Sequence, residues 1–385
     1  MPQNILKQYW GYDSFRKGQE EAITSTLEGK DVLVLMPTGG GKSLCYQVPG
    51  LAMEGICLVI TPLIALMKDQ VEGLRKVGVK AESIHSGLSN REIDTILDNC
   101  AYGQIKFLYC SPERLQTELM QERVGKMTVN MLVVDEAHCI SQWGYDFRPS
   151  YLEIDKFREF VGDVPMMALT ASATPVVQKD IKERLGLKNP EVFSTTYYRS
   201  NLVYGVRKVE DKTARLIEIL NKVPGSAIVY TRSRRSTKDL AGILNSEGVG
   251  AEFYHGGLDH HQRDQKQNHW IDNKKRVMVA TNAFGMGIDK PDVRLVVHMD
   301  IPEDIESYYQ EAGRAGRDGK RSFCVLLYTA DDIANFREKI QQRMADPGFL
   351  KDCYQSLANF TDTGIGFGAF RSFDFNLRKF CAVYQ

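Results

Sequence analysis

The sequence predicts an α/β protein with two tandem parallel-sheet domains and a short, mainly helical C-terminal extension. Short, nearly all-apolar runs alternate with helical patterns, which is typical of strands buried on both faces of a parallel sheet. The same alternation restarts after Tyr197-Tyr198-Arg199-Ser200-Asn201. We therefore expect one domain over residues 1–200, a second over residues 201–335 and the extension over residues 336–385.

Each expected strand is a run of β-branched and other apolar residues followed by a turn. The first domain has five such runs: Asp31–Met36, Gly55–Thr61, Ile105–Tyr109, Met131–Asp135 and Met166–Thr170. Helical patterns lie between them, for example over Ala65–Val77 and Ser89–Cys100. The second domain has four: Ser226–Tyr230, Arg276–Ala280, Leu295–Met299 and Phe323–Tyr328.

The pattern changes from about Ala334 onward. The extension reads as helical at first and then becomes rich in glycine and phenylalanine. Its aromatic residues either pack a small helical platform or rest on a partner domain; they include Phe367, Phe370, Phe373, Phe375 and Phe380. We expect a small appended domain or the beginning of a longer one that the chain cuts off.

Composition excludes several classes of protein. The 385 residues include 49 Lys and Arg and 49 Asp and Glu, so the formal net charge is zero. Hydrophobic residues at 43% exclude a disordered or collagen-like chain, and neutrality means that any nucleic-acid track must be local. The eight cysteines form no Cys-x-x-Cys pair, which predicts reduced thiols and no structural zinc.

The sequence also predicts the compartment. The N-terminus has no apolar signal core, and the most apolar stretch, Gly55–Met67, is interrupted by Thr61-Pro62. It is shorter than the ~18 continuous apolar residues that a membrane span needs. We expect a cytoplasmic, monomeric protein with no membrane contact.

A glycine-rich loop follows the first expected strand and opens a helix. It contains Thr38, Gly39, Gly40, Gly41, Lys42 and Ser43. Glycines allow backbone N–H groups to surround phosphate oxygens, and the helix N-terminus favours negative charge. Lys42 would reach the β- and γ-phosphates, and Ser43 would hold Mg²⁺. Because Met36 stands where the strict pattern has glycine, a glycine-rich turn with a chance lysine is the alternative.

A second signal lies in the same domain. The strand that contains Met131–Val134 ends in Asp135-Glu136-Ala137-His138. A carboxylate at this end of a parallel strand points into the ligand crevice. Asp135 can bind Mg²⁺, and Glu136 can orient or deprotonate an attacking water. Together the two signals favour nucleotide hydrolysis, although an isolated Asp-Glu pair is also common at solvated strand ends.

These motifs, followed by Cys139-Ile140-Ser141-Gln142-Trp143-Gly144-Tyr145-Asp146-Phe147-Arg148-Pro149, resemble the RecQ family of superfamily 2 DNA helicases. The resemblance covers about residues 5–330. Further segments that match in family order are Ser111–Arg114, Ala168–Thr174, Thr281–Lys290 and Gln310–Gly319. The resemblance implies two RecA-like lobes with ATP and Mg²⁺ between them. It also implies 3′ to 5′ movement on single-stranded DNA, unwinding of partially duplex DNA and a role in DNA repair or recombination.

The resemblance also implies the residues of the nucleotide site. Gln19 would pair with adenine, and Arg16 or Tyr12 would stack on it. Arg317 is the first candidate to contact the γ-phosphate, and Arg314 is the second. The alternative is that both arginines simply belong to a flexible basic turn. The catalytic set would be Lys42, Asp135, Glu136, His138, Gln310, Arg314 and Arg317, and Asp289 would join the residues that bind nucleotide.

The aromatic segment after Asp135 is the candidate coupling element between DNA and hydrolysis. Aromatic faces stack on unpaired bases at ~1–3 kcal/mol each. Phe147 is as readily explained as core. The expected DNA contacts are Thr61, Pro62, Lys68, Arg114, Gln142, Trp143, Phe147, Arg148, Thr231, Arg232, His255 and Thr281.

The sequence departs from the family at two places. Ser172 replaces the usual threonine, and we expect the four-cysteine zinc module to be absent or replaced, since only Cys353 and Cys381 follow the core. DNA-stimulated ATP hydrolysis and translocation are therefore firmer expectations than duplex unwinding. Two alternatives remain: an RNA-stimulated ATPase of the same superfamily, and a nucleotide-gated binding module that does not hydrolyse ATP.

Overall fold

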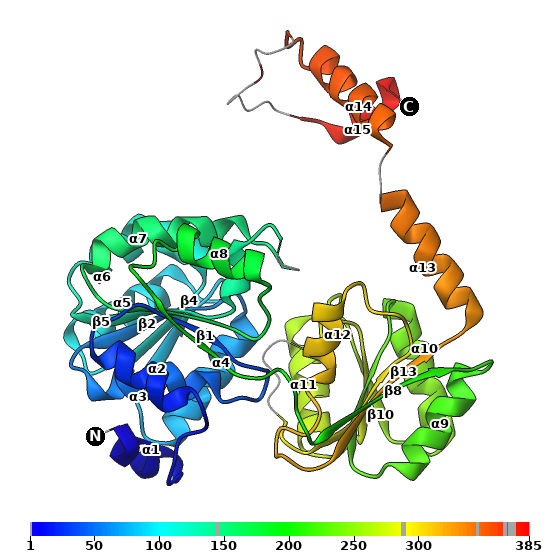
Figure 1. Cartoon of the computed structure of the whole chain (residues 1–385), viewed down its shortest axis with the longest axis horizontal. Coiled ribbons are helices and arrows are strands. Elements are labelled where there is room, and N and C mark those ends of the chain that lie inside the picture. The colour runs from blue at the N-terminus through cyan, green and yellow to red at the C-terminus, as the bar shows by residue number, and fades with distance from the viewer. Residues whose placement is uncertain are drawn as a thin grey trace. The chain divides into compact units, whose positions relative to one another are not determined.

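The structure is a computed structural model that describes residues 2–143, 146–285, 290–343, 346–364, 368 and 375–384. The chain divides into two compact units, residues 1–327 and residues 328–385. The first unit holds two parallel-stranded α/β lobes, each built on its own sheet (Figure 1). This is the tandem α/β architecture that the sequence predicts.

The first lobe is a seven-stranded sheet in the order β3-β4-β2-β5-β6-β1-β7 within the described residues. Every strand pair for which a register is given is parallel, for example β1 with β6. The strands are β1 (Val32–Leu35), β2 (Ile56–Ile60), β3 (Ala81–Ile84), β4 (Phe107–Cys110), β5 (Val129–Val134), β6 (Met166–Thr170) and β7 (Glu191–Ser194).

Helices cover both faces of this sheet, so its central strands are buried on both sides (Figure 1). Strand β1 sends Leu33 and Leu35 into one core and Val32 and Val34 into the other, because successive side chains point to opposite faces. One face carries α1 (Pro2–Trp10), α2 (Gln19–Leu27), α3 (Lys42–Ala52) and α4 (Ile64–Lys76). The other carries α5 (Asn90–Tyr102), α6 (Glu118–Val124), α7 (Ile154–Val161) and α8 (Pro175–Arg184).

The second lobe repeats this plan with six strands in the order β10-β11-β9-β12-β13-β8. They are β8 (Leu202–Lys208), β9 (Ser226–Tyr230), β10 (Ala251–Tyr254), β11 (Val277–Ala280), β12 (Val293–His298) and β13 (Ser322–Tyr328). One core takes side chains from α9 (Lys212–Lys222) and α10 (Arg234–Ser246). The other takes Trp270 of α11 (His260–Ile271) and Ala312 of α12 (Ile305–Ala312).

Four strands were missed by the sequence analysis, and each lies at the edge of a sheet. They are β3, β7, β8 and β10. An edge strand is partly exposed, so its residues need not all be apolar. Strand β8 contains Arg207 and Lys208, and most of its residues are exposed or half-buried. A search for nearly all-apolar runs therefore identifies the central strands but not the edge strands.

The second unit is helical where it is described. It contains α13 (Ala330–Arg343), α14 (Pro347–Phe360) and α15 (Leu377–Val383). Phe360 packs against Phe375 and Phe380 at ring-centroid distances of 5.8 and 5.5 Å. These contacts form a small aromatic cluster, whereas Phe367, Phe370 and Phe373 lie outside the described residues.

A buried ion pair ties the strand before the phosphate loop to the rest of the first lobe. Asp31 is 2% exposed and accepts hydrogen bonds from both terminal nitrogens of Arg158, at 2.7 and 2.8 Å. It also accepts from the backbone N–H groups of Met166 and Lys188, at 2.8 and 2.7 Å. All its strong acceptor positions are thus satisfied inside the protein.

Asp31→Ala is expected to destabilise the first lobe by about 3–5 kcal/mol, because it leaves the Arg158 charge and two N–H groups buried without their acceptor. Urea denaturation would measure the loss. Lys188→Ala, which removes only the exposed bridge to Asp163, is the control and should change stability by less than about 0.5 kcal/mol. Equal, small effects of both changes would contradict this account of the lobe.

Candidate active site

The loop after β1 has the geometry of a phosphate cradle. Gly39 and Gly41 have φ of 73° and 80°, the left-handed region that disfavours side chains, and α3 begins directly after Gly41. A β-carbon on Gly40 would lie 2.8 Å from the carbonyl oxygen of Pro37, so the turn is too tight for one. Nζ of Lys42 lies 3.3 Å from the carbonyl oxygen of Met36, which places the ammonium within the loop.

Two side chains at the start of α2, from Arg16 just before the helix and Gln19 at its first position, hold this loop in place. Nη1 of Arg16 donates to the carbonyl of Gly39 at 2.7 Å, and Nε2 of Gln19 donates to that of Gly41 at 3.0 Å. Oε1 of Gln19 accepts from the backbone N–H of Arg16 at 2.8 Å. Both ends of the Gln19 amide are therefore engaged with protein in this structure. An incoming base would have to exchange these hydrogen bonds for its own.

The carboxylates after β5 lie in a low-dielectric setting. Burial, reinforced by the neighbouring Glu136 carboxylate, raises the pKa of Asp135 to about 7. The backbone of Glu136 has φ of 48°, and its N–H donates to Asp135 at 2.9 Å. The left-handed turn at Glu136 therefore lies between two consecutive carboxylates, Asp135 and Glu136, that both follow the end of β5.

His138 connects this strand end to the next one. Its ring is 2% exposed, and Nδ1 lies 2.9 Å from Oγ1 of Thr170 at the end of β6. The same nitrogen lies 3.4 Å from a carboxylate oxygen of Glu136. Burial lowers the pKa of His138, so the ring is neutral near pH 7.

One cavity of about 460 Å³ collects most of the expected nucleotide residues from both lobes. Those that line it are Tyr12, Arg16, Gln19, Thr38, Gly39, Gly41, Lys42, Ser43, Asp135, Glu136, Gln310, Arg314 and Arg317. Gly40 lies within the loop itself, and His138 lies outside the lining. Asp289 falls outside the described residues.

The two arginines of the second lobe differ in their surroundings. Arg314 is 7% exposed, and its Nη1 donates to the carbonyl of Gly285. The Arg317 side chain lies against the phosphate loop, since a β-carbon on Gly39 would lie 3.2 Å from its Cγ. Arg317 is thus beside the loop that would hold phosphates, whereas Arg314 is anchored within its own lobe.

The donor set fits a hard divalent cation. Ser43 and the half-buried Asp135 carboxylate line the same cavity, and oxygen ligands of this kind suit Mg²⁺. Oε2 of Glu136 is buried and accepts no hydrogen bond within the described part of the chain. A cation with its waters would satisfy the charge that burial leaves uncompensated at this strand end.

Comparison with known proteins agrees with this geometry. The DEAD/DEAH box helicase family model matches residues 16–181, and the helicase conserved C-terminal domain model matches residues 211–319. The chain is 42% identical to the probable ATP-dependent DNA helicase RecS of Bacillus subtilis over 360 residues, which cover 92% of this chain and 72% of that one. The chain belongs to the RecQ family.

Within the RecQ family the chain covers only part of some members. It is 46% identical to the ATP-dependent DNA helicase RecQ of Bacillus subtilis over 343 residues, or 88% of this chain and 58% of that protein. The chain therefore spans little more than half the length of this relative. A solved structure of Saccharomyces cerevisiae Dbp5, bound to RNA and ADP BeF3, matches with a TM-score of 0.67 at 19% identity and covers 89% and 91% of the two chains. At that identity the likeness concerns the fold alone.

The aromatic segment that resembles the RecQ coupling element begins shortly after the carboxylates of Asp135 and Glu136. The Trp143 side chain is exposed (76% for the residue), and the backbone N–H of Trp143 donates to Oγ of Ser141 at 3.2 Å. Arg148 donates to the carbonyl of Pro62 at 3.0 Å and pairs with Asp146. Phe147 is half-buried, and residues 144 and 145 lie outside the described residues. The segment thus presents an exposed indole while it is tied to the end of β2.

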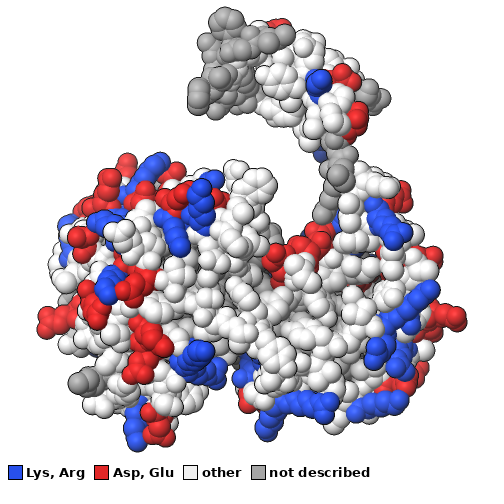
Figure 2. All heavy atoms as spheres, viewed as in Figure 1, with Lys and Arg blue, Asp and Glu red and all other residues white. Residues whose placement is uncertain are grey.

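The other expected DNA contacts are spread along the ends of strands. Thr61, Thr231 and Thr281 are buried and directly follow β2, β9 and β11. Lys68, Gln142 and Arg232 are exposed, whereas Arg114 and His255 are half-buried. On the face seen in Figure 2, patches of Lys and Arg are interspersed with patches of Asp and Glu. Because the formal net charge of the chain is zero, any DNA track must be local.

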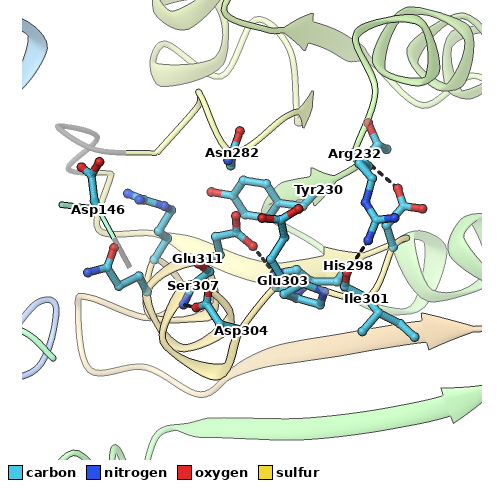
Figure 3. A pocket seen from close by; sticks show the side chains of 15 residues that line it. Asp146, Tyr230, Arg232, Asn282, His298, Ile301, Glu303, Asp304, Ser307 and Glu311 are labelled. Atoms are coloured by element: carbon cyan, nitrogen blue, oxygen red, sulfur yellow. Dashed lines mark hydrogen bonds and ion pairs between the residues drawn. The ribbon is translucent and has the colours of Figure 1, made fainter. Parts of the chain in front are cut away.

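A second hollow, of about 410 Å³, is lined mainly by residues of the second lobe, together with Asp146 of the first lobe (Figure 3). Gln310 and Arg314 line both. Within this hollow His298 lies 2.8 Å from Glu311, and the backbone N–H of Arg232 donates to Asp300 at 2.7 Å. Arg232 is consequently engaged with an acidic strand end in this structure.

Sequence reasoning missed several residues that line the nucleotide cavity. Among them are Asp69 and Gln70 of α4, together with Leu6 of α1 and Pro291. Gln70 accepts a hydrogen bond from Gln47 of α3 at 3.0 Å. The only available signal was proximity to Thr61-Pro62 and Lys68, because single polar residues on a helix form no recognisable motif.

Two further observations concern metal-binding side chains and membrane-spanning helices. Among the described residues, no group of three or more His, Cys, Asp or Glu side chains is placed to hold a metal ion. None of the described helices is both long and apolar enough to cross a membrane.

Proposed function

We propose that this chain is an ATP-dependent motor that moves along single-stranded DNA. The observation that carries the proposal is the shared cavity, in which Lys42, Asp135 and Glu136 of the first lobe face Arg317 of the second. Phosphoryl transfer depends mainly on positioning and charge stabilisation, and this set supplies both. Membership of the RecQ family supports DNA as the polymer.

Each side chain of the set would have a distinct task. Lys42 would neutralise charge on the β- and γ-phosphates, and Glu136 would orient the attacking water and accept its proton. Ser43 and Asp135 would hold Mg²⁺, which when bound neutralises phosphate charge. Arg317 would stabilise the charge that develops on the γ-phosphoryl group.

Because hydrolysis would need residues of both lobes, ATP hydrolysis would be coupled to movement of the lobes. A γ-phosphate that contacts Lys42 and Arg317 together favours a closed arrangement, and its loss after hydrolysis removes that preference. We propose that the lobes meet near residue 200, between β7 and β8. DNA held by both lobes would then be gripped alternately. The family resemblance supports 3′ to 5′ movement, and we further propose a cytoplasmic location and a monomeric state, as the sequence predicts.

Trp143 would report DNA occupancy to the hydrolytic site. It belongs to the segment that leaves η2 (Ala137–Ile140), directly after Glu136. Trp143→Ala should therefore reduce DNA-stimulated ATP turnover about 10-fold while basal turnover stays the same, since stacking contributes ~1–3 kcal/mol. A coupled ATPase assay with and without single-stranded DNA would measure this.

The control is Tyr102→Ala, which removes a similarly exposed aromatic residue (73%) at the end of α5. It should leave stimulation intact. A matched RNA oligonucleotide separates the alternative function: stimulation by RNA equal to that by DNA would reject the DNA motor. An unchanged response of the Trp143 variant would reject the assigned coupling role.

A further inference from the structure

The segment that joins the two lobes, residues 195–201, contacts the arginine-bearing turn of the second lobe, residues 313–317. Nη1 of Arg199 donates to the carbonyl of Gly313 at 2.7 Å, and Nη2 donates to the carbonyl of Gly316 at 2.6 Å. One planar guanidinium therefore bridges both ends of the turn that carries Arg314 and Arg317. A fork of this kind fixes distance and orientation together.

Two neighbours of Arg199 strengthen the same connection. Nδ2 of Asn201 donates to the carbonyl of Gly316 at 2.8 Å. The Tyr309 hydroxyl of α12 donates to the carbonyl of Tyr197 at 2.9 Å, and their rings meet edge to face at 5.9 Å. The joining segment is thus attached to α12 as well as to the turn that follows it.

Arg199 does not line the nucleotide cavity, although it lies close behind it. A β-carbon on Gly39 would lie 3.8 Å from Nη1 of Arg199 and 3.2 Å from Cγ of Arg317. Burial and the nearby Arg317 charge lower the pKa of Arg199 from its usual value. Two like charges are therefore held near one loop, and the carbonyls of Gly313 and Gly316 compensate Arg199.

We propose that Arg199 is a positioning residue that holds Arg317 against the phosphate loop and so links the interlobe segment to hydrolysis. This inference rests on the proposed function, because it assumes that Arg317 meets the γ-phosphate. Without the bridge the turn would lose two charge-assisted hydrogen bonds from one side chain. Arg317 would then sample positions away from the loop while the rest of the site stayed intact.

The test compares Arg199→Ala, Arg199→Lys and Arg317→Ala with the double variant Arg199→Ala/Arg317→Ala. Steady-state kcat and KM for ATP would be measured with saturating single-stranded DNA. A displacement of ~1 Å can reduce rate by ~10²-fold, so Arg199→Ala should lower kcat by roughly that factor and leave KM within about 2-fold. Lysine keeps the charge but cannot bridge both carbonyls, so Arg199→Lys should remain at least about 10-fold impaired.

The double variant separates positioning from a folding defect. If Arg199 acts through Arg317, the double variant should turn over no more slowly than Arg317→Ala alone. Arg207→Ala is the matched control, because within the described residues this exposed arginine of β8 donates to the carbonyl of its neighbour Val206 alone, and it should retain full activity. Thermal unfolding of every variant would monitor the fold.

The outcomes distinguish this inference from the function on which it rests. Additive losses in the double variant, or full activity of Arg199→Lys, would overturn the positioning role. If Arg317→Ala itself retained wild-type turnover, the proposed function, in which Arg317 acts in hydrolysis, would be rejected before the inference about Arg199. If Arg317→Ala were inactive and Arg199→Ala fully active, only the inference about Arg199 would fail.

Discussion

Arg317→Ala is expected to reduce DNA-stimulated ATP turnover by about 10³–10⁵-fold, the contribution of an arginine that stabilises charge on a transferring phosphoryl group. The side chain lies against the phosphate loop, lines the same cavity as Lys42 and comes from the opposite lobe. Binding of ATP in the ground state should change much less, because the first lobe supplies the cradle. Single-turnover hydrolysis together with a fluorescent-nucleotide binding assay would separate the two effects.

Arg321→Ala is the matched control for this variant. Arg321 is an exposed arginine four residues further along the chain, and its guanidinium lies 5.6 Å from the ring of Phe323. It should leave turnover unchanged. Arg314 is a less informative choice, because it is buried and bound to Gly285, so its removal also disturbs the second lobe. Near-normal turnover by Arg317→Ala would reject the assignment of hydrolysis to both lobes.

Glu136→Gln is expected to lower ATP turnover by about 10²–10⁴-fold, because an amide cannot accept the proton of the attacking water. The change is nearly isosteric, so the turn after β5 and the hydrogen bond from the Glu136 N–H to Asp135 should persist. The variant should therefore still bind ATP and DNA. Lys42→Ala should also abolish turnover, but with weaker nucleotide binding, since it removes a phosphate contact.

Glu122→Gln provides the matched control, since Glu122 is an exposed residue of the same lobe that forms an ion pair with Lys126. Its turnover should equal that of the wild type. Unchanged turnover by Glu136→Gln would show that the chemistry has been assigned to the wrong residue. Loss of ATP binding by this variant would instead indicate a structural role for the carboxylate.

The sequence predicted those parts of the fold whose structure depends on residues adjacent to one another in the chain. Central strands such as β1 and β5 are apolar along their whole length because helices cover both faces. The loop that contains Gly39 and Gly41 was recognised because left-handed backbone and close approach restrict those positions to glycine. Both signals are readable residue by residue along the chain.

The remaining features depend on contacts between distant segments. Nothing near Asp31 in the sequence indicates its partner Arg158, 127 residues away. Likewise Arg199 precedes its acceptor at Gly316 by 117 residues. Edge strands escaped detection because partial exposure removes the apolar pattern. The fold class followed from composition and periodicity, whereas the supports of the site could be seen only in three dimensions.

The engagement of Gln19 illustrates a further limit. The family resemblance implied that Gln19 recognises adenine, but its amide binds the phosphate loop and the Arg16 backbone in this structure. A motif indicates which hydrogen-bonding side chains are present, but it does not indicate which partners they bind in the folded protein. The same holds for Arg232, whose backbone N–H donates to Asp300 and whose Nη2 donates to the carbonyl of Ile301.

Displacement of streptavidin from biotinylated single-stranded DNA tests the central claim most directly. The wild-type chain should displace streptavidin from the 5′ end in the presence of ATP and Mg²⁺, and much more slowly from the 3′ end. Glu136→Gln should displace it from neither end. ATP-dependent displacement no faster than that of Glu136→Gln would contradict a translocating motor, whereas faster release from the 3′ end would reverse the proposed polarity.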